Sequence, residues 1–308
     1  MSAPRSRNRR VDSRPTTPHA AERNPLLASR YVHRIGPVAG AGTVIVVILI
    51  IFFLPYLWIV ASSLKSQFEI FADVRPLSFR AFVPLNPTLE NFVGIGERGV
   101  GRAMINSLIV AVTQVVLTAA VCSTAAFALT RIGFRGSNVL FIAILMTFLV
   151  PVEALLVPLY RVISGLSLLD TFAAVYLPWL ASPFALFILK QAFEDVPREL
   201  DEAARVDGAG YGRIFFSIVL PNVKPALATM SLMIFMFSWN SFLWPLVVLQ
   251  SRDKQLVQVA VAQSVSPGDL PNWGLTFAGT AAATIPLVIL FLFLQRYFVQ
   301  GIASTGIK

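Results

Sequence analysis

One charged stretch of the sequence, residues 193–221, has the residue types and spacing of a segment that docks on another protein. Pro197 stands where a first helical turn would begin, and acidic residues follow it at the positive end of that helix. Ala203 and Ala204 lie on one helical face, where small side chains permit close backbone approach, and Gly208 ends the helix. The positions expected to carry the docking are Glu202, Ala203, Ala204, Asp207, Gly208 and Ala209. From the residues alone, a solvated amphipathic loop is an equally good interpretation.

A second set of residues lies inside long apolar segments, where polar groups are expensive and usually face a cavity or another helix. These candidates for contact with a solute are Asn106, Gln114, Glu153, Trp239 and Asn240. A Trp ring beside an Asn amide suits a sugar, because the ring stacks on apolar faces and the amide hydrogen-bonds hydroxyl groups. The competing interpretation is packing between helices. For Glu153, an ion pair with Arg161 is a further alternative.

Several kinds of chemistry are missing from the sequence. No G-x-x-x-x-G-K-[ST] phosphate-binding loop occurs, so the chain cannot bind ATP by that route. His19 and His33 fall in or near the N-terminal tail, and Cys122 is the single cysteine, so no His-based metal or catalytic cluster is predicted. We therefore expect a non-catalytic chain with no metal and no cofactor of its own.

The elements that must position these residues are predicted to be membrane helices. The 308 residues are 56% hydrophobic and only 13% charged, whereas a soluble domain is about 25% charged. The net charge of +9 could indicate nucleic acid as a partner. The basic residues collect beside apolar segments, however, so we expect a membrane partner and no nucleic acid.

Six segments with few or no charges are long enough to cross a hydrocarbon layer of roughly 30 Å. The predicted spans are 37–61, 103–130, 138–160, 171–190, 223–249 and 274–296. The third span requires that Glu153 be tolerated, and prolines such as Pro151, Pro183 and Pro245 are expected to kink or end their helices. Residues 35–308 are thus predicted to be an all-α domain of six transmembrane helices. An Arg/Pro-rich tail, residues 1–34, is expected to be disordered.

The distribution of basic residues predicts the orientation of these helices. If the N-terminus is cytoplasmic, 17 of the 25 Lys and Arg residues fall on the inside segments, as the positive-inside rule requires. This orientation puts both termini and the stretch 193–221 in the cytoplasm.

Motifs spread along the chain resemble those of one transporter family. The string Glu202-Ala203-Ala204, followed by Asp207-Gly208-Ala209, is similar to the EAA loop of binding-protein-dependent ABC importers. Other motifs resembling the MalG-like carbohydrate permeases follow in order over residues 55–245: Ser62-Ser63-Leu64-Lys65, Leu89-Glu90-Asn91-Phe92, Asn106-Ser107, Ala125-Ala126-Phe127-Ala128-Leu129, Pro158-Leu159-Tyr160 and Trp239-Asn240. The ordered series is much more specific than the triplet alone.

The resemblance implies a MetI-like permease fold, a mechanism and a set of partners. In that family the loop forms a coupling helix that docks in a cleft of an ATPase subunit. Glu202 would then pair with a basic group, Ala203 and Ala204 would fit the cleft, and Gly208 would give the bend. The implied partners are a second MalF-like permease subunit, two ATPase subunits that bind ATP and Mg, an extracytoplasmic solute-binding protein and membrane lipid. The implied location is the bacterial cytoplasmic membrane.

Two questions stay open at this point. The first is the driving force, because an ion-coupled secondary transporter would also cross the membrane many times. That class is expected to show internal repeats and several buried acids, and the single Glu153 together with the EAA-like loop argues against it. The second question is the solute. The resemblance implies a sugar or sugar-like compound, with a glycerophosphate-type or other non-sugar solute as the alternative.

Overall fold

The structure is a computed structural model that describes residues 25–74, 78–264 and 272–305. These residues form helices joined by connections, and no β-strand occurs among them. The all-α prediction is therefore confirmed for the described part of the chain. The chain divides into two compact units, Met1–Pro55 and Tyr56–Lys308. Every site discussed below lies within the second unit.

The N-terminal helix, α1 (Pro25–Ser63), begins earlier than predicted. We expected a disordered tail as far as residue 34, and this was wrong for residues 25–34. Pro25 has a fixed φ that suits the first position of a helix, and residues 26–35 contain no Gly or Pro that would interrupt it. The rest of the predicted tail, residues 1–24, lies outside the described residues. The apolar part of α1, Gly42–Ser63, is long enough to cross a membrane.

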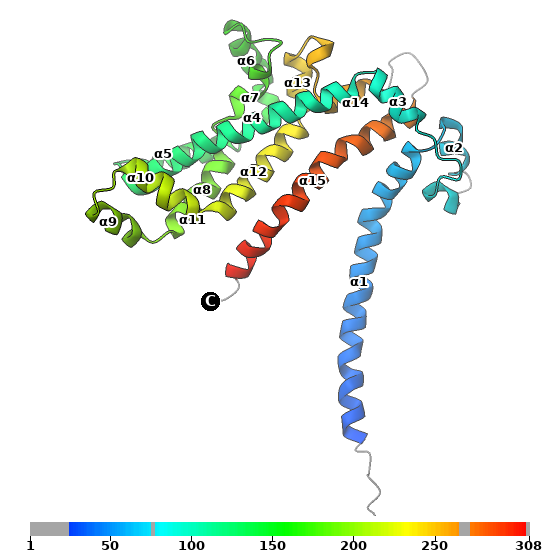
Figure 1. Cartoon of the computed structure of the whole chain (residues 1–308), viewed down its shortest axis with the longest axis horizontal. Helices are drawn as coiled ribbons and strands as arrows, with labels where there is room; N and C mark the ends of the chain where they lie inside the picture. Colours follow the sequence, from blue (N-terminus) through cyan, green and yellow to red (C-terminus); the bar gives the residue numbers. More distant parts are fainter. Residues whose placement is uncertain (1–24, 75–77, 265–271, 306–308) are drawn as a thin grey trace, which may run out of the picture. The chain divides into compact units, whose positions relative to one another are not determined.

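A bundle of helices forms the core of the second unit (Figure 1). In it, α4 (Val100–Phe127) packs against α8 (Pro183–Asp195) and α12 (Lys224–Trp239), and α12 also packs against α15 (Trp273–Thr305). Apolar residues such as Val110 fill the interior of the bundle. Many large apolar side chains also point outward, which is typical of a surface that contacts lipid or other subunits.

Three of the predicted spans are interrupted. α5 (Ser137–Thr147) and α6 (Val152–Gly165) meet at 99°, and Pro151 caps α6 at the break. The segment Phe172–Trp179, made of α7 (Phe172–Tyr176) and η3 (Leu177–Trp179), meets α8 at 48°, and Pro183 is the first residue of α8. Both prolines therefore lie where they were expected to end a helix.

The fifth predicted span, 223–249, is also broken. α12 ends at Trp239, and α13 (Leu243–Val248) follows after a short irregular segment. Pro245 explains the break, because its ring would clash with the carbonyl of Ser241 in a continuous helix. At its other end, α12 meets the segment Tyr211–Asn222 at 79°. By length and composition, the described residues contain three helices able to cross a membrane, or up to six spans if each bent pair is one span.

The segment after α1 folds around one buried cation. Lys65 is 1% exposed, and its Nζ donates to Asp73 Oδ2 at 2.9 Å and to the carbonyl of Arg80. The Asn91 side-chain amide donates to the carbonyls of Ser63 at 3.0 Å and Lys65 at 2.8 Å. These bonds tie together the end of α1 and three short elements, α2 (Gln67–Ala72), η1 (Phe79–Phe82) and α3 (Glu90–Glu97).

Asp170 ties the connection after α6 to the connection after α13. Its carboxylate accepts hydrogen bonds from the backbone N–H groups of Gln250 at 3.0 Å and Ser251 at 2.9 Å, and from Ser251 Oγ at 2.5 Å. It also pairs with Lys254 Nζ at 3.0 Å, in η5 (Arg252–Lys254). The hydrogen bond from the Ser251 hydroxyl, with the other donors, lowers the pKa of Asp170 well below its ordinary value. The two connections are therefore held as one unit, from which α14 (Val257–Ser264) continues.

Candidate coupling site and solute pathway

The stretch predicted to dock on a partner contains α9 (Arg198–Val206), as its residue pattern indicated. Pro197 is the N-cap, and Glu199 and Asp201 lie in the first turn. Arg205 lies in the last turn. Each charge is at the helix end whose partial charge stabilises it.

Gly208 ends this helix through its backbone conformation. Its φ is +79°, in the left-handed region that favours glycine. The N–H of Ala209 donates to the Ala204 carbonyl at 2.8 Å, and the N–H of Gly208 donates to the Arg205 carbonyl at 3.0 Å. These two bonds form a Schellman motif. The predicted bend is present, and its hydrogen bonds fix its direction.

Arg131 holds the start of α9 against the rest of the bundle. Its Nε lies 3.1 Å from Asp201 Oδ2, and its Nη2 donates to the carbonyls of Phe193 at 3.0 Å and Val196 at 2.7 Å. The side chains of Arg131 and Asp201 are only 3% and 10% exposed. A planar guanidinium can serve several acceptors at once, which suits the carbonyls where α8 ends and the carboxylate where α9 begins. Arg131 lies in the π-helical turn that directly continues α4, so one side chain joins this turn to α8 and α9.

A second arginine and an aromatic cluster reinforce this junction. Arg198 Nη2 donates to the carbonyl of Thr130 at 3.0 Å. The Phe127 ring contacts Phe215 and Tyr211 edge-on, with centroids 5.2 Å and 6.3 Å apart. Arg198 thus joins α9 to the π-helical turn η2 (Ala128–Ile132), and Phe127 joins α4 to α10 (Tyr211–Ile214) and to the π-helical turn η4 (Phe215–Val219). The short helix α11 (Leu220–Asn222) follows η4. π-Helical turns are frequent at functional sites.

The six predicted docking residues divide between two faces. Glu202, Ala203, Asp207 and Gly208 are exposed, whereas Ala204 and Ala209 are partly buried and pack on the core beneath α9. We had placed Ala203 and Ala204 on one apolar face; in the structure Ala203 is exposed and Ala204 is partly buried against the core. Val206 is 88% exposed, so the free face also presents a larger apolar side chain that sequence reasoning did not single out.

Three of the five candidate solute-pathway residues are buried within this chain. Asn106 donates to the carbonyls of Asp253 at 2.9 Å and Gln255 at 3.0 Å. Trp239 is 1% exposed, and its Nε1 donates to the Ala283 carbonyl at 3.0 Å. Gln114 is also 1% exposed. The bonds of Asn106 and Trp239 are the helix-packing contacts that were the competing interpretation.

The other two candidates are exposed. Asn240, the C-cap of α12, accepts a weak hydrogen bond from Gln258 Nε2 at 3.4 Å. Glu153 lies in the first turn of α6, directly after the 99° bend. It forms no ion pair with Arg161 or with any other residue that the structure describes. Contact with a solute stays a prediction for all five residues, and these two are the accessible ones.

Sequence reasoning missed the pairing of Arg131 with Asp201. It considered the acidic residues after Pro197 only as charges at the start of a helix, and it did not single out Arg131. A lone arginine directly beside an apolar segment was the available signal.

Within the described residues, no group of three or more His, Cys, Asp or Glu side chains could hold a metal ion.

Several known proteins are similar to this chain in sequence. Residues 120–304 match the family described as binding-protein-dependent transport system inner membrane component. The arabinooligosaccharides transport system permease protein AraQ of Halalkalibacterium halodurans is 36% identical over 257 residues, which cover 82% of this chain and 90% of that protein. The sn-glycerol-3-phosphate transport system permease protein UgpE of Escherichia coli O1:K1 is 33% identical over 266 residues, 84% of this chain and 92% of that protein.

A solved structure shows the same fold. It is a bacterial ABC transporter involved in the import of the acidic polysaccharide alginate. The match has a TM-score of 0.76 at 21% sequence identity, and it covers 92% of this chain and all of the other.

Proposed function

Because this chain belongs to the family of binding-protein-dependent transport system inner membrane components, we propose that α9 couples it to an ATPase and that its helices carry a sugar or sugar-like solute. The chain is a permease of an ABC importer and a multi-pass integral membrane protein. Family membership favours this function over an ion-coupled secondary transporter. The proposed location is the bacterial cytoplasmic membrane, with both termini inside.

The proposed assembly contains four further subunits. A second MalF-like permease would complete the pathway, two ATPase subunits would bind ATP and Mg, and an extracytoplasmic binding protein would deliver the solute. This chain would not hydrolyse ATP itself. Its contribution would be to convert the closing and opening of the ATPases into movement of the helices.

The observation that carries this proposal is the two-sided construction of α9. Its inner side is joined to α4 and α8 through Asp201 and Arg131. Its outer side exposes Glu202, Ala203 and Asp207, next to the bend at Gly208. A helix that is exposed on one side and fixed to the bundle on the other can transmit a push from a partner. A solvated loop would not need a buried ion pair to hold it.

The solute is proposed from the relatives. One of them belongs to an arabinooligosaccharide system, and another to a lactose system, the permease protein LacG of Rhizobium radiobacter, 36% identical over 200 residues. We therefore propose a sugar. The relative from a glycerol-3-phosphate system favours a glycerophosphate-type solute as the second candidate. Asn240 and Glu153 are the proposed contacts in this chain.

Gly208→Asp tests the coupling role. A Cβ built at Gly208 meets nothing within 4 Å, but any side chain at φ +79° is strained. Because Asp adopts this region more readily than most residues, we expect the variant to stay folded in the membrane with a local distortion at the bend. The new carboxylate would stand on the exposed side beside Asp207, where it would be costly to desolvate in the cleft of a partner. The complete importer would be reconstituted in liposomes containing ATP. We expect solute uptake to fall at least tenfold and the ATPase to be lost on co-purification.

Gly99→Asp is the matched control. Gly99 is the N-cap of α4, far from α9 in the chain; its φ of +83° imposes the same backbone strain, and a Cβ there also meets nothing within 4 Å. This variant should transport normally and retain the ATPase. Normal uptake by Gly208→Asp would overturn the coupling assignment.

A further inference from the structure

The segment that follows α1 carries large apolar side chains on its outer surface. They belong to α2, to η1, to the connection after η1 and to α3. Those that are more than half exposed are Phe68, Phe71, Phe79, Leu85, Leu89 and Val93. Single exposed apolar residues are normal on a protein surface, whereas a group of them marks an interaction site. None of these residues belongs to the coupling site or to the candidate solute pathway.

The two short helices of this segment have a packed inner side as well as an apolar outer side. In α2, Ile70 is buried and Glu69 is partly buried, whereas Phe68 is 82% exposed. In η1, Ala81 is buried and Phe79 is 79% exposed. A helix on the surface of a water-soluble domain turns its polar residues outward. Here the outward residues are phenylalanines, which indicates that this side meets a second apolar phase.

Hydrogen bonds hold the segment close to the end of α1. Lys65 Nζ donates to Asp73 Oδ2 at 2.9 Å and to the carbonyl of Arg80, the residue after Phe79. The N–H of Thr88, which precedes the exposed Leu89, donates to the Leu64 carbonyl at 2.8 Å. Leu64 and Lys65 are the first two residues after α1. The exposed apolar residues from 68 to 89 therefore lie near the point at which α1 ends.

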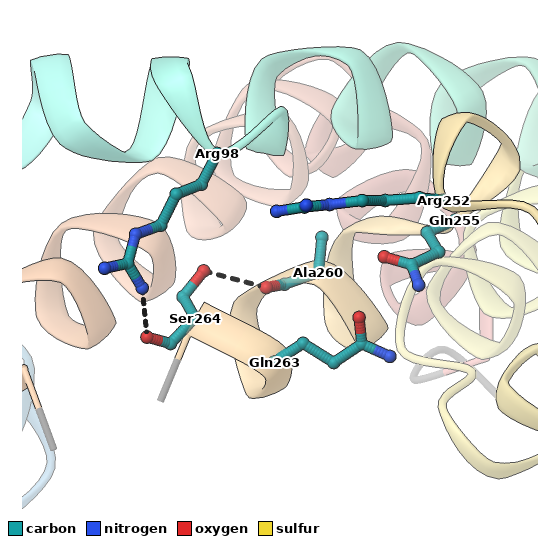
Figure 2. Close-up of a pocket in the computed structure, with 6 residues that line it drawn as sticks. All are labelled: Arg98, Arg252, Gln255, Ala260, Gln263 and Ser264. Atoms are coloured by element: carbon teal, nitrogen blue, oxygen red, sulfur yellow. Dashed lines mark hydrogen bonds between the residues drawn. The ribbon is translucent and has the colours of Figure 1, made fainter. Parts of the chain in front are cut away.

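The other end of the segment is fixed to the bundle. Arg98, the C-cap of α3, donates from Nη1 to the Ser264 carbonyl at 2.8 Å, beside a polar cavity of about 190 Å³ that Arg252 also lines (Figure 2). The helix α3 also packs against α15. Because the segment is held at both ends, its outer residues keep a defined position.

The length of α1 places its end at a membrane surface. Its apolar part, Gly42–Ser63, has 22 residues. At about 1.5 Å per residue this is roughly 33 Å of helix, close to the roughly 30 Å of one hydrocarbon layer. The N–H groups of Leu64 and Lys65 donate to carbonyls at the end of α1, so the connection is a turn rather than an extended chain. The helix α2, which starts at Gln67, therefore begins at the level of the headgroups, a region about 5–8 Å thick.

The apolar surface also continues along the chain from this span into α2. In the last turns of α1, Leu57 and Val60 are exposed, and the next exposed large apolar residue is Phe68. Short helices at this depth insert phenylalanine and leucine side chains between the headgroups and the ends of the acyl chains. A water-soluble partner would have to reach residues at the level of the headgroups. Lipid is therefore the occupant that the position of these residues favours.

We propose that α2 and η1 lie on the membrane surface at which α1 ends, with Phe68, Phe71 and Phe79 inserted into the lipid. The inference goes beyond the proposed function, because it assigns a lipid contact outside the membrane-spanning helices. It holds whichever side of the membrane this surface is.

Spin labels test this arrangement in the complete importer in lipid nanodiscs. The variants are Phe68→Cys and Phe79→Cys, each with Cys122→Ala and with partner subunits that lack cysteine, so that one nitroxide is attached at a time. Collision of the nitroxide with oxygen, which concentrates in lipid, is compared with its collision with a water-soluble nickel chelate. We expect the ratio of oxygen to chelate collisions at both positions to be severalfold higher than at a position in water.

Glu97→Cys is the matched control in water, because Glu97 is an exposed residue of the same segment, at the end of α3, and its charge would be costly in lipid. Lipids labelled at known depths provide the reference for lipid. Ratios at Phe68→Cys and Phe79→Cys equal to that at Glu97→Cys would mean that these positions face water, and would overturn the proposal. Labels that are immobile and collide with neither reagent would also overturn it, since a protein would then cover the surface.

The result does not depend on the coupling site. Phe68 and Phe79 are exposed, so their replacement removes no side chain from the core, and the measurement requires neither ATP nor solute. Failure of this proposal is therefore distinguishable from failure of coupling, which is measured separately with Gly208→Asp.

Discussion

The guanidinium Nε of Arg131 lies 3.1 Å from Oδ2 of Asp201, and both side chains are buried. This pair joins the turn η2, which continues α4, to the first turn of α9, the exposed helix proposed to receive the ATPase. Arg131 also binds two carbonyls at the end of α8. Removing one partner of a buried ion pair is strongly destabilising, because it leaves an uncompensated charge. We therefore expect α9 to move together with α4 and α8.

The first prediction concerns Asp201→Asn, which keeps the shape of the side chain and removes its charge. Because Arg131 would lose its ionic partner, we expect the free energy of unfolding to fall by about 3 kcal/mol. We also expect the ATPase activity of the complete importer to respond less to solute. Thermal unfolding in detergent and solute-stimulated ATP hydrolysis measure the two effects.

Arg131→Lys is the companion variant, since it keeps the charge but loses the planar fork that reaches several acceptors. It should show the same two defects in milder form. Arg135→Lys is the control, because Arg135 is exposed and forms no ion pair among the described residues. The prediction fails if Asp201→Asn behaves like Arg135→Lys in both assays.

The second prediction concerns Gly274→Ala, near the start of α15. A Cβ at this position would lie 2.8 Å from Asn91 Cγ and 2.9 Å from Asn91 Nδ2. Asn91 cannot move away freely, because it donates to the carbonyls of Ser63 and Lys65. We expect a loss of about 1–3 kcal/mol from overpacking, seen as a lower unfolding temperature.

Gly101→Ala provides the contrast for this variant. Gly101 lies in the helix α4, and a Cβ there meets nothing within 4 Å. Replacing it should leave stability unchanged or raise it by about 0.5–1 kcal/mol, because alanine loses less backbone entropy in a helix. Equal stability of Gly274→Ala and wild type would show that Asn91 does not constrain this contact.

The third prediction concerns pH and Asp170. Its donors lower its pKa below the ordinary value of 3.8, so the carboxylate stabilises the folded state above that value. This stability is lost only as the pH falls through the still lower folded pKa. At pH 7, Asp170→Asn should therefore speed hydrogen exchange at the Gln250 and Ser251 amides.

Asp170→Asn also tests over which pH range the hydrogen bonds depend on the ionised Asp170 carboxylate. The difference in exchange between wild type and Asp170→Asn should persist at pH 5 and shrink only in stronger acid. A difference that disappears near pH 5 would contradict a lowered pKa. Thr171→Ser, which retains a hydroxyl side chain beside Asp170, should match the wild type at every pH.

Much of the architecture could be predicted from the sequence. The apolar segments show where helices lie, and Pro151 and Pro183 show where two of them end. The helix over 198–206 and its end at Gly208 also follow from local residue types. These features depend on residues close together in the chain, whose backbone preferences act within one or two turns.

The N-terminal tail and the fifth predicted span differ from the sequence-based expectation. The tail was taken as disordered from its composition, yet α1 begins at Pro25. The span 223–249 was taken as one segment because it is apolar throughout, although Pro245 was among the prolines expected to kink or end a helix. Hydropathy does not show that α12 ends at Trp239, and the clash of the Pro245 ring with a carbonyl one turn earlier accounts for the break.

The sequence by itself determined that this protein is a helical membrane protein with a short charged helix that ends at Gly208, because hydropathy, charge and helical spacing act locally. Only the tertiary structure decided which side chains face one another. It brought Arg131 to Asp201, turned Ala204 inward, and buried Trp239 against Ala283. It also placed Arg98 and Arg252 around one cavity. These residues are far apart in the chain, and only the packing of the helices brings their side chains together.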